Sequence, residues 1–215
     1  MKRMCLLLVL FVGTLCRAQQ CDTCFTSSPI PDSVFFRMKG KSYKADCTVP
    51  RDELRYLRLS YCDGKGKTQT GEMVCNKAIA EDLVRIFREL WKAGYRIERM
   101  RLIDEYDADD QRSMEANNTS CFNFRMISGT KKISKHGRGV AVDINPLYNP
   151  YVYTRGGVQK VEPKDGKKWA YNRKTRKDIP YKIDESDLCY KLFTQHGFRW
   201  GGSWTTRKDY QHFEK

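Results

Sequence analysis

The stretch that decides the fold runs from residue 134 to residue 144 and reads SKHGRGVAVDI. Val140, Val142 and Ile144 alternate onto one face of a strand. Asp143 falls on the opposite face. A carboxylate among apolar strand residues costs free energy when it is buried without a partner. A cation beside Asp143 would remove that cost, so the stretch predicts a strand that carries a metal ligand.

Histidine is scarce, and two of the three histidines stand near carboxylates. His136 precedes the strand, and His212 lies three residues after Asp209 in the sequence DYQH. Zinc in a hydrolase takes three protein ligands and keeps one position open for water. Glycines let the chain return His136 and Asp143 to one point. We therefore expect His136, Asp143 and His212 to hold Zn²⁺, although structural histidines capped by carboxylates would also explain this spacing.

A hydrolase needs a proton acceptor and a group that stabilises charge on the attacked carbonyl. If residues 209–211 form a turn, Asp209 addresses the same metal site as His212, and positioned proton transfer contributes about 10²–10⁴-fold in rate. Residues 122–127 alternate as a strand with Arg125 on the polar face, which makes Arg125 the candidate oxyanion partner. The helix-borne H-E-x-x-H pattern and a nucleophile elbow around Ser134 are both absent from the sequence.

Two ordered motifs resemble a known family. Residues 134–144 resemble the SxHxxGxAxD signature of the D-alanyl-D-alanine carboxypeptidase family of zinc peptidases. Residues 197–204 (GFRWGGSW) and 209–213 (DYQHF) resemble the GFxWGGxW…DxxHF ending of its branch that includes L-alanyl-D-glutamate endopeptidases. The resemblance covers about residues 77–215.

This resemblance implies roles for individual residues. His136, Asp143 and His212 would be zinc ligands, Asp209 the catalytic acid and base, and Arg125 the substrate-polarising cation. The implied reaction is amide hydrolysis in peptidoglycan stem peptides, at the D-Ala-D-Ala end or within the L-Ala-D-Glu link. The implied fold is α+β and hedgehog/DD-peptidase-like, an antiparallel sheet flanked by helices. A non-catalytic, zinc-containing module that binds the cell wall is the alternative, and a basic polyanion-binding protein is a second.

Hydrophobic periodicity places the remaining elements. Residues 77–93 repeat apolar side chains at helical spacing and stop at Gly94, which predicts a helix, and residues 187–196 predict a shorter one. We expect strands at residues 95–103, 122–127, 139–144, 198–204 and 210–214, a polar loop at 104–120, and a long basic insertion at 146–182.

Residues 1–18 read as a signal peptide, with a positive start, a short apolar run and cleavage after Ala18. Lipidation of Cys16 and retention of this segment as an anchor are the weaker alternatives. A secreted or periplasmic location permits disulfides, but seven cysteines follow the cleavage site, so at least one thiol stays unpaired in a monomer. We expect residues 19–76 to be an irregular, cysteine-containing extension packed on a catalytic domain formed by residues 77–215.

Composition fits one domain with a basic surface. The chain has 215 residues, of which 40% are hydrophobic, enough for one core. The net charge is +14, and +11 remains without the three basic residues of the leader. Such a charge draws polyanions. Besides stem peptides, anionic cell-wall polymers are therefore candidate partners of an exported protein, and nucleic acid is not. Beyond the leader no apolar run is long enough to span a membrane.

Overall fold

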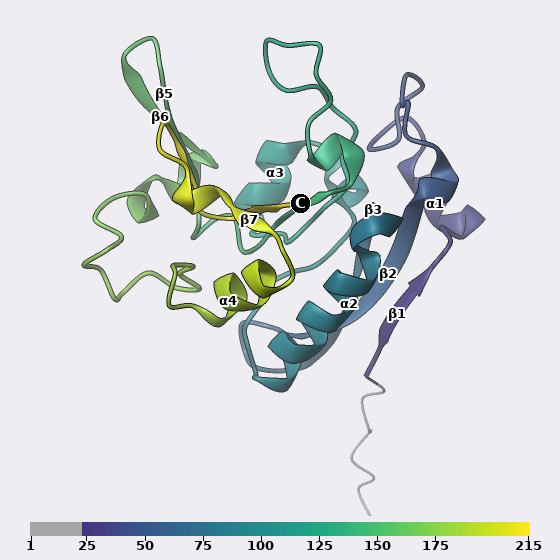
Figure 1. Ribbon diagram of the computed structural model, residues 1–215, viewed down its shortest axis with the longest axis horizontal. Coiled ribbons are helices and arrows are strands. Elements are labelled where there is room, and N and C mark those ends of the chain that lie inside the picture. The colour runs from purple at the N-terminus through teal and green to yellow at the C-terminus, as the bar shows by residue number, and fades with distance from the viewer. Residues whose placement is uncertain (1–22) are drawn as a thin grey trace, which may run out of the picture.

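The computed structural model describes residues 23–215. The expected leader, with its cleavage site after Ala18, lies outside the described residues. Helices alternate with short strands, and the described part of the chain forms three antiparallel sheets of three strands each. Figure 1 shows the N-terminal sheet on one side of the molecule and the hairpin β5–β6 projecting on the other. The expected α+β class is confirmed.

The expectation of an irregular segment over residues 19–76 is wrong for its described part, because two nine-residue strands lie within it. Asp63 closes the turn between them by accepting hydrogen bonds from two amides of the turn. Leu57 and Leu59 alternate along the first strand and are fully buried, so alternation outweighs the many turn residues. The sheet has the order β1-β2-β3, with β1 at Phe25–Ser28, β2 at Leu54–Cys62 and β3 at Thr68–Asn76, and α1 spans Asp32–Met38.

The long helix predicted from residue 77 is confirmed as α2, which spans Lys77–Lys92. The side chain of Asn76 accepts a hydrogen bond from the amide of Ala78 at 2.9 Å and caps the first turn. Gly94 follows the helix with a φ of +67°, a conformation that ends helices.

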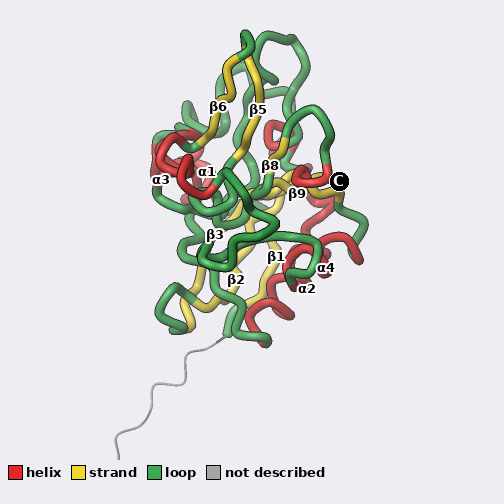
Figure 2. Tube along the Cα trace, turned by 90° about the vertical axis from the view of Figure 1, so that its left-hand side faces the viewer, coloured by secondary structure: helices red, strands yellow, loops and turns green. Residues whose placement is uncertain are grey.

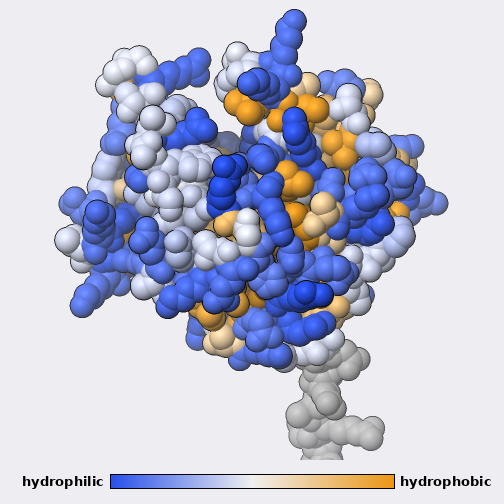
Figure 3. Space-filling model, viewed as in Figure 1, coloured by the Kyte–Doolittle hydropathy of each residue, from blue (hydrophilic) through white to orange (hydrophobic). Residues whose placement is uncertain are grey.

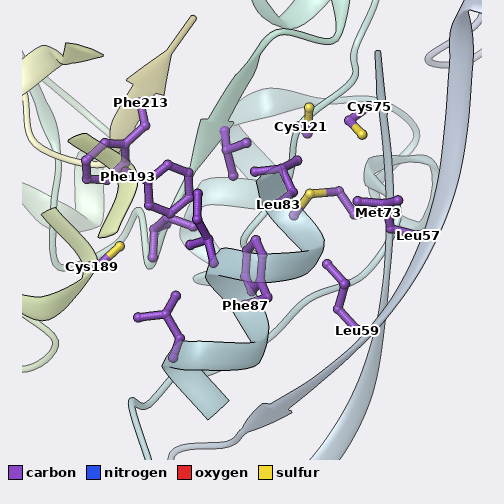
Figure 4. Packing of buried hydrophobic residues seen from close by; sticks show 14 of the residues in the cluster. Leu57, Leu59, Met73, Cys75, Leu83, Phe87, Cys121, Cys189, Phe193 and Phe213 are labelled. Atoms are coloured by element: carbon purple, nitrogen blue, oxygen red, sulfur yellow. The ribbon is translucent and has the colours of Figure 1, made fainter. Parts of the chain in front are cut away.

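One hydrophobic core joins early and late parts of the chain. Leu83 and Phe87 of α2 belong to the same buried cluster as Leu57 of β2 (Figure 4). On the other side of α2, Phe193 stacks on Phe213 with 4.4 Å between ring centroids. Each such side chain contributes about 1.5–3 kcal/mol by leaving water. The core therefore runs across the boundary expected after residue 76, and that boundary stays a prediction.

Two small sheets carry the C-terminal half. Figure 2 shows the hairpin β5–β6 rising from the molecule at the end opposite to the N-terminal strands. The second helix predicted near the C-terminus is confirmed as α4, and Asp187 caps it by accepting a hydrogen bond from the amide of Cys189. One sheet has the order β4-β9-β7, from Ala141–Asp143, His212–Glu214 and Arg199–Trp200; the other has the order β6-β5-β8, from Val158–Glu162, Tyr151–Arg155 and Lys208–Asp209; α4 spans Leu188–Gln195.

Several expected segments differ from the structure. Residues 95–103 and 122–127 make only isolated bridges, so both predicted strands are wrong, although Ile97, Met100 and Phe124 are buried as the alternation implied. The strand expected at 198–204 is shortened to Arg199–Trp200, because a 3₁₀ turn follows it. The expected loop at 104–120 contains the helix α3. The short helical segments are α3 at Asp110–Glu115 and the 3₁₀ turns η1 at Arg51–Glu53, η2 at Ile103–Tyr106, η3 at His136–Arg138, η4 at Lys164–Trp169 and η5 at Gly201–Ser203.

The six cysteines among residues 23–215 are free thiols, and four of them are buried. None of the helices in this part of the chain is both long enough and apolar enough to cross a bilayer.

Candidate metal centre

His136 sits in η3, a tight turn fixed on both sides. The Oγ atom of Ser134 accepts a hydrogen bond from the amide of Gly137 at 2.9 Å, which closes the turn. Gly139 then leaves the turn with a φ of +70°, and a Cβ atom there would lie 2.8 Å from the amide nitrogen of Asn76. The turn therefore rests directly on the end of β3.

Asp143 and His212 face each other on neighbouring strands. They are paired residues in the register of β4 and β9, and directly opposite residues project on the same face of a sheet. Val142 and Ile144 are fully buried on the other face. The alternation read from the sequence is thus confirmed, and it turns Asp143 away from the core and toward His212.

The three predicted ligands meet at one point. The Nδ1 atom of His212 lies 3.0 Å from Oδ1 of Asp143, and the Nε2 atom of His136 lies 3.2 Å from Oδ2 of Asp143. The two imidazole nitrogens are 3.1 Å apart. A tetrahedral zinc ion with bonds of 2.0–2.1 Å separates its ligand atoms by roughly 3.3 Å. His136, Asp143 and His212 thus form a group able to hold a metal ion.

The hydrogen bonds of the imidazoles fit a cation between them. Nδ1 of His136 donates to the backbone carbonyl of Cys121 at 2.8 Å. In the neutral ring, Nε2 therefore carries the lone pair. Nε2 of His212 faces Glu214 at 3.4 Å, so in the neutral ring Nδ1 carries the lone pair. Two lone pairs and the carboxylate of Asp143 then point at one another. A proton or a metal ion at their centre makes this arrangement favourable, and the nitrogen and oxygen donors are those that zinc accepts.

Cys121 and Glu214 were not predicted as parts of the site. A backbone carbonyl such as that of Cys121 leaves no signal in a sequence. Glu214 did leave one, because it stands two residues after His212 in a strand and so projects on the same face.

Burial and neighbouring charges shift the pKa values of Asp143 and His212. Burial opposes the charge of Asp143, but the imidazoles of His136 and His212 hold the pKa of this carboxyl well below its usual range. Burial disfavours the charged form of His212, but the carboxylates of Asp143 and Glu214 outweigh it and raise its pKa to about 10. The apo-site therefore attracts a proton, which a metal must displace.

Asp209, the predicted proton acceptor, is half-buried in β8 beside the metal group. Burial raises its pKa to about 7, although the nearby His212 acts to lower it. Its Oδ1 atom has no hydrogen-bond partner among the described residues. A Cβ atom on Gly201 would lie 2.8 Å from the Cβ of Asp209 and 3.2 Å from that of His212, so only glycine permits η5 to pack against both.

Arg125 reaches the site with its backbone. Its carbonyl accepts a hydrogen bond from the amide of Ser134 at 3.0 Å, which places it along the His136 turn. Its guanidinium pairs with Asp110 of α3 at 2.5 Å between Nε and Oδ2. The predicted contact of Arg125 with substrate stays a prediction. The third histidine, His196, pairs with Asp82 at 3.0 Å and is not part of the metal group.

An α+β fold that converges two imidazoles and a carboxylate on one point, with a further half-buried carboxylate beside them, defines a candidate metallohydrolase. The model of a protein family described as D-alanyl-D-alanine carboxypeptidase matches residues 128–215. The resemblance read from the sequence is thereby confirmed for this part of the chain, which contains His136, Asp143, Asp209 and His212. No curated protein and no solved structure matches the chain, so the hedgehog/DD-peptidase-like arrangement stays a prediction.

Proposed function

We propose that the protein is a zinc metallopeptidase that hydrolyses amide bonds of peptidoglycan stem peptides, as a D-Ala-D-Ala carboxypeptidase or an L-Ala-D-Glu endopeptidase. Asp209 carries this proposal. A half-buried carboxylate whose fully buried Oδ1 atom lacks a partner is costly to the fold. Placed beside a metal group and with a pKa raised to about 7, it suits proton transfer near neutral pH.

Zinc bound by His136, Asp143 and His212 would act as a Lewis acid on the scissile carbonyl and make a water molecule acidic enough to attack it. Asp209 accepts the proton from the attacking water and delivers it to the leaving amine. Arg125 stabilises negative charge on the attacked carbonyl oxygen. Its guanidinium has more N–H donors than Asp110 can occupy, so the ion pair between them leaves donors for substrate.

The alternative is a non-catalytic module that holds zinc and binds the cell wall. Such a module would need the three ligands but would gain nothing from Asp209. The two functions therefore differ in what a change at Asp209 does, because the enzyme loses turnover and the binding module loses nothing.

The test uses purified protein that begins at residue 19, freed of metal with a chelator and then reloaded with zinc. We expect one zinc per chain, stem-peptide cleavage only in the reloaded protein, and fragment masses that identify the bond cut. Asp209→Ala should keep its zinc and lose nearly all turnover, whereas Asp178→Ala, which removes an exposed carboxylate paired with Arg176, should do neither. Full turnover in Asp209→Ala, or zinc without turnover in the unchanged protein, would contradict the proposal.

We also propose that the protein is secreted or periplasmic, because the cell-wall substrate lies outside the cytoplasm. The net charge of +11 that remains without residues 1–18 fits attraction to anionic cell-wall polymers as well. N-terminal sequencing of protein recovered from the medium or periplasm should give a chain that starts at Gln19. A chain found only in the cytoplasm with its leader intact would contradict this location.

A further inference from the structure

The hairpin of the basic insertion borders the strand that carries Asp209. In this pairing, Tyr151 of β5 stands opposite Asp209 of β8, the proposed base. Opposite residues share a face, and so do alternate residues of one strand. Tyr153 is therefore on the face of Tyr151, and the two rings stack with 4.7 Å between centroids. Arg207, two residues before Asp209 and directly ahead of β8, extends the same row.

Aromatic rings hold Arg207 near the metal group. Its guanidinium carbon lies 4.7 Å from the ring of Trp204, a cation–π distance. The ring of Trp204 in turn lies 5.4 Å from that of His212. On the insertion side, burial raises the pKa of Tyr151 and the nearby Arg207 guanidinium opposes that shift. Arg207 thus stands between the insertion and the metal ligand, separated from the ligand by one indole ring.

Arg207 differs from the other arginines at this site in its partners. Arg125 pairs with Asp110, and Arg199 pairs with Glu214 at 2.8 Å. Arg207 forms no ion pair with any residue from 23 to 215 and is exposed. Figure 3 shows the surface hollowed between the hairpin β5–β6 and the neighbouring loop. The planar guanidinium of Arg207 contacts Tyr151 but keeps further donors, and these suit two parallel hydrogen bonds to a carboxylate.

We propose that Arg207 binds the α-carboxylate of the substrate residue that leaves as the amine. This inference rests on the proposed function and names the group that the site recognises. In D-Ala-D-Ala the leaving residue carries the terminal carboxylate. In the L-Ala-D-Glu link the chain continues through the side-chain carboxyl of D-Glu, and its α-carboxylate is free. Both candidate bonds therefore place a carboxylate one residue beyond the scissile carbonyl.

The position of Arg207 fits that requirement. Successive residues are about 3.8 Å apart, so the partner of this carboxylate must stand close to the metal group without occupying it. Arg207 meets both conditions, because the ring of Trp204 contacts both its guanidinium and the ring of His212. Asp209, on the same row of side chains, would then deliver its proton to the amine of the residue that Arg207 holds.

The experiment compares stem peptides in two forms. A pentapeptide ending in D-Ala-D-Ala and a tripeptide containing the L-Ala-D-Glu link are each prepared with the leaving residue's α-carboxylate free and as its primary amide. The zinc-loaded protein should prefer the acid. Arg207→Gln should raise KM for the acid about tenfold or more, leave kcat nearly unchanged and leave the amide unaffected, because the lost contact holds substrate and transition state alike. Arg207→Lys should restore part of the preference.

Arg155→Gln, at the end of β5 in the hairpin, removes the same charge and should leave the preference intact. Equal loss on acid and amide in Arg207→Gln, or no preference in the unchanged protein, would overturn the proposal. If neither peptide is cleaved, the proposed function fails, but calorimetric binding of the same four peptides to the zinc-loaded protein still tests Arg207. There, acid peptides should bind about tenfold more weakly to Arg207→Gln, and equal affinities would refute the contact.

Discussion

Asp143 and His212 are opposite residues of a strand pair, with 3.0 Å between Oδ1 and Nδ1. His212 therefore owes its position to strand register, although it lies only three residues from the end of the chain. Its strand β9 is central in the sheet β4-β9-β7. Residues on paired strands are held more accurately than residues on loops, so the pairing of β4 with β9 fixes two of the three members of the metal group relative to each other.

Metal affinity should depend on pH. Burial disfavours a charged His212, but Asp143 and Glu214 raise its pKa to about 10 in the apo-protein. Zinc must displace that proton at every pH below about 10, so the dissociation constant should increase about tenfold for each unit by which pH falls. Calorimetry in buffers of different ionisation enthalpy should show about one proton released per zinc. A pH-independent dissociation constant between pH 6 and 8.5 would exclude a protonated apo-site.

Glu214 should strengthen the metal site by orienting His212. The carboxylate faces Nε2 at 3.4 Å and keeps Nδ1 directed at the metal group. Glu214→Gln keeps the shape but removes the charge, and such outer partners are worth about 10–100-fold in metal affinity. Competition with a chromophoric chelator measures the loss. Glu89→Gln, which alters an exposed ion pair with Lys92, is the control, and equal affinities in the two variants would contradict the role of Glu214.

The three residues of the candidate metal group could be predicted from the sequence, whereas the surroundings that orient them could not. His136 and His212 are two of only three histidines, and the alternation around Asp143 is local. Alternation of this kind involves only neighbouring residues, so it can be recognised without knowing which distant segments pack against the strand. The ion pair of Arg125 with Asp110 joins a loop to the short helix α3, and nothing near either residue in the sequence indicates that contact.

The place of the insertion in the fold and the strands of the N-terminal sheet could not be predicted from the sequence either. Pairing of β5 with β8 joins Tyr151 to Asp209 across 58 positions of the chain, so the basic composition of the insertion gave no indication that it borders the site. In β2, the alternation of the buried Leu57 and Leu59 is typical of a strand. The cysteines and glycines around them favour turns more strongly, and the sequence therefore predicts an irregular segment where the structure has a strand.

The ionised side chain of Asp209 should lower the free energy of unfolding. Burial raises its pKa to about 7, so the folded apo-protein keeps a proton there that the unfolded chain releases near pH 3.9. Stability therefore falls as pH rises from about 4 to 7. Asp209→Asn cannot ionise and should stabilise the apo-protein by at least ~1 kcal/mol at pH 8 and by nothing at pH 4, while turnover falls about 10²–10⁴-fold. Urea unfolding at both pH values checks this, and a variant less stable than wild type at pH 8 would count against it.

Gly139 should couple the N-terminal sheet to the metal group. Its φ of +70° disfavours alanine by about 1–2 kcal/mol, and a Cβ atom there would lie 2.8 Å from the amide nitrogen of Asn76. Because that neighbour is backbone at the end of β3, it cannot move aside cheaply, and overpacking adds about 1–3 kcal/mol. Gly139→Ala should therefore lower the free energy of unfolding by about 2–5 kcal/mol and weaken zinc binding through His136.

Gly156 provides the matched control, since its φ is +58° and a Cβ atom there would meet nothing within 4 Å. Gly156→Ala should show only the conformational cost of about 1–2 kcal/mol, with zinc affinity unchanged. Urea unfolding and zinc titration of the two variants separate backbone strain from contact with β3. Equal effects in both would mean that β3 does not support the His136 turn, and the metal group would then depend on the C-terminal sheets alone.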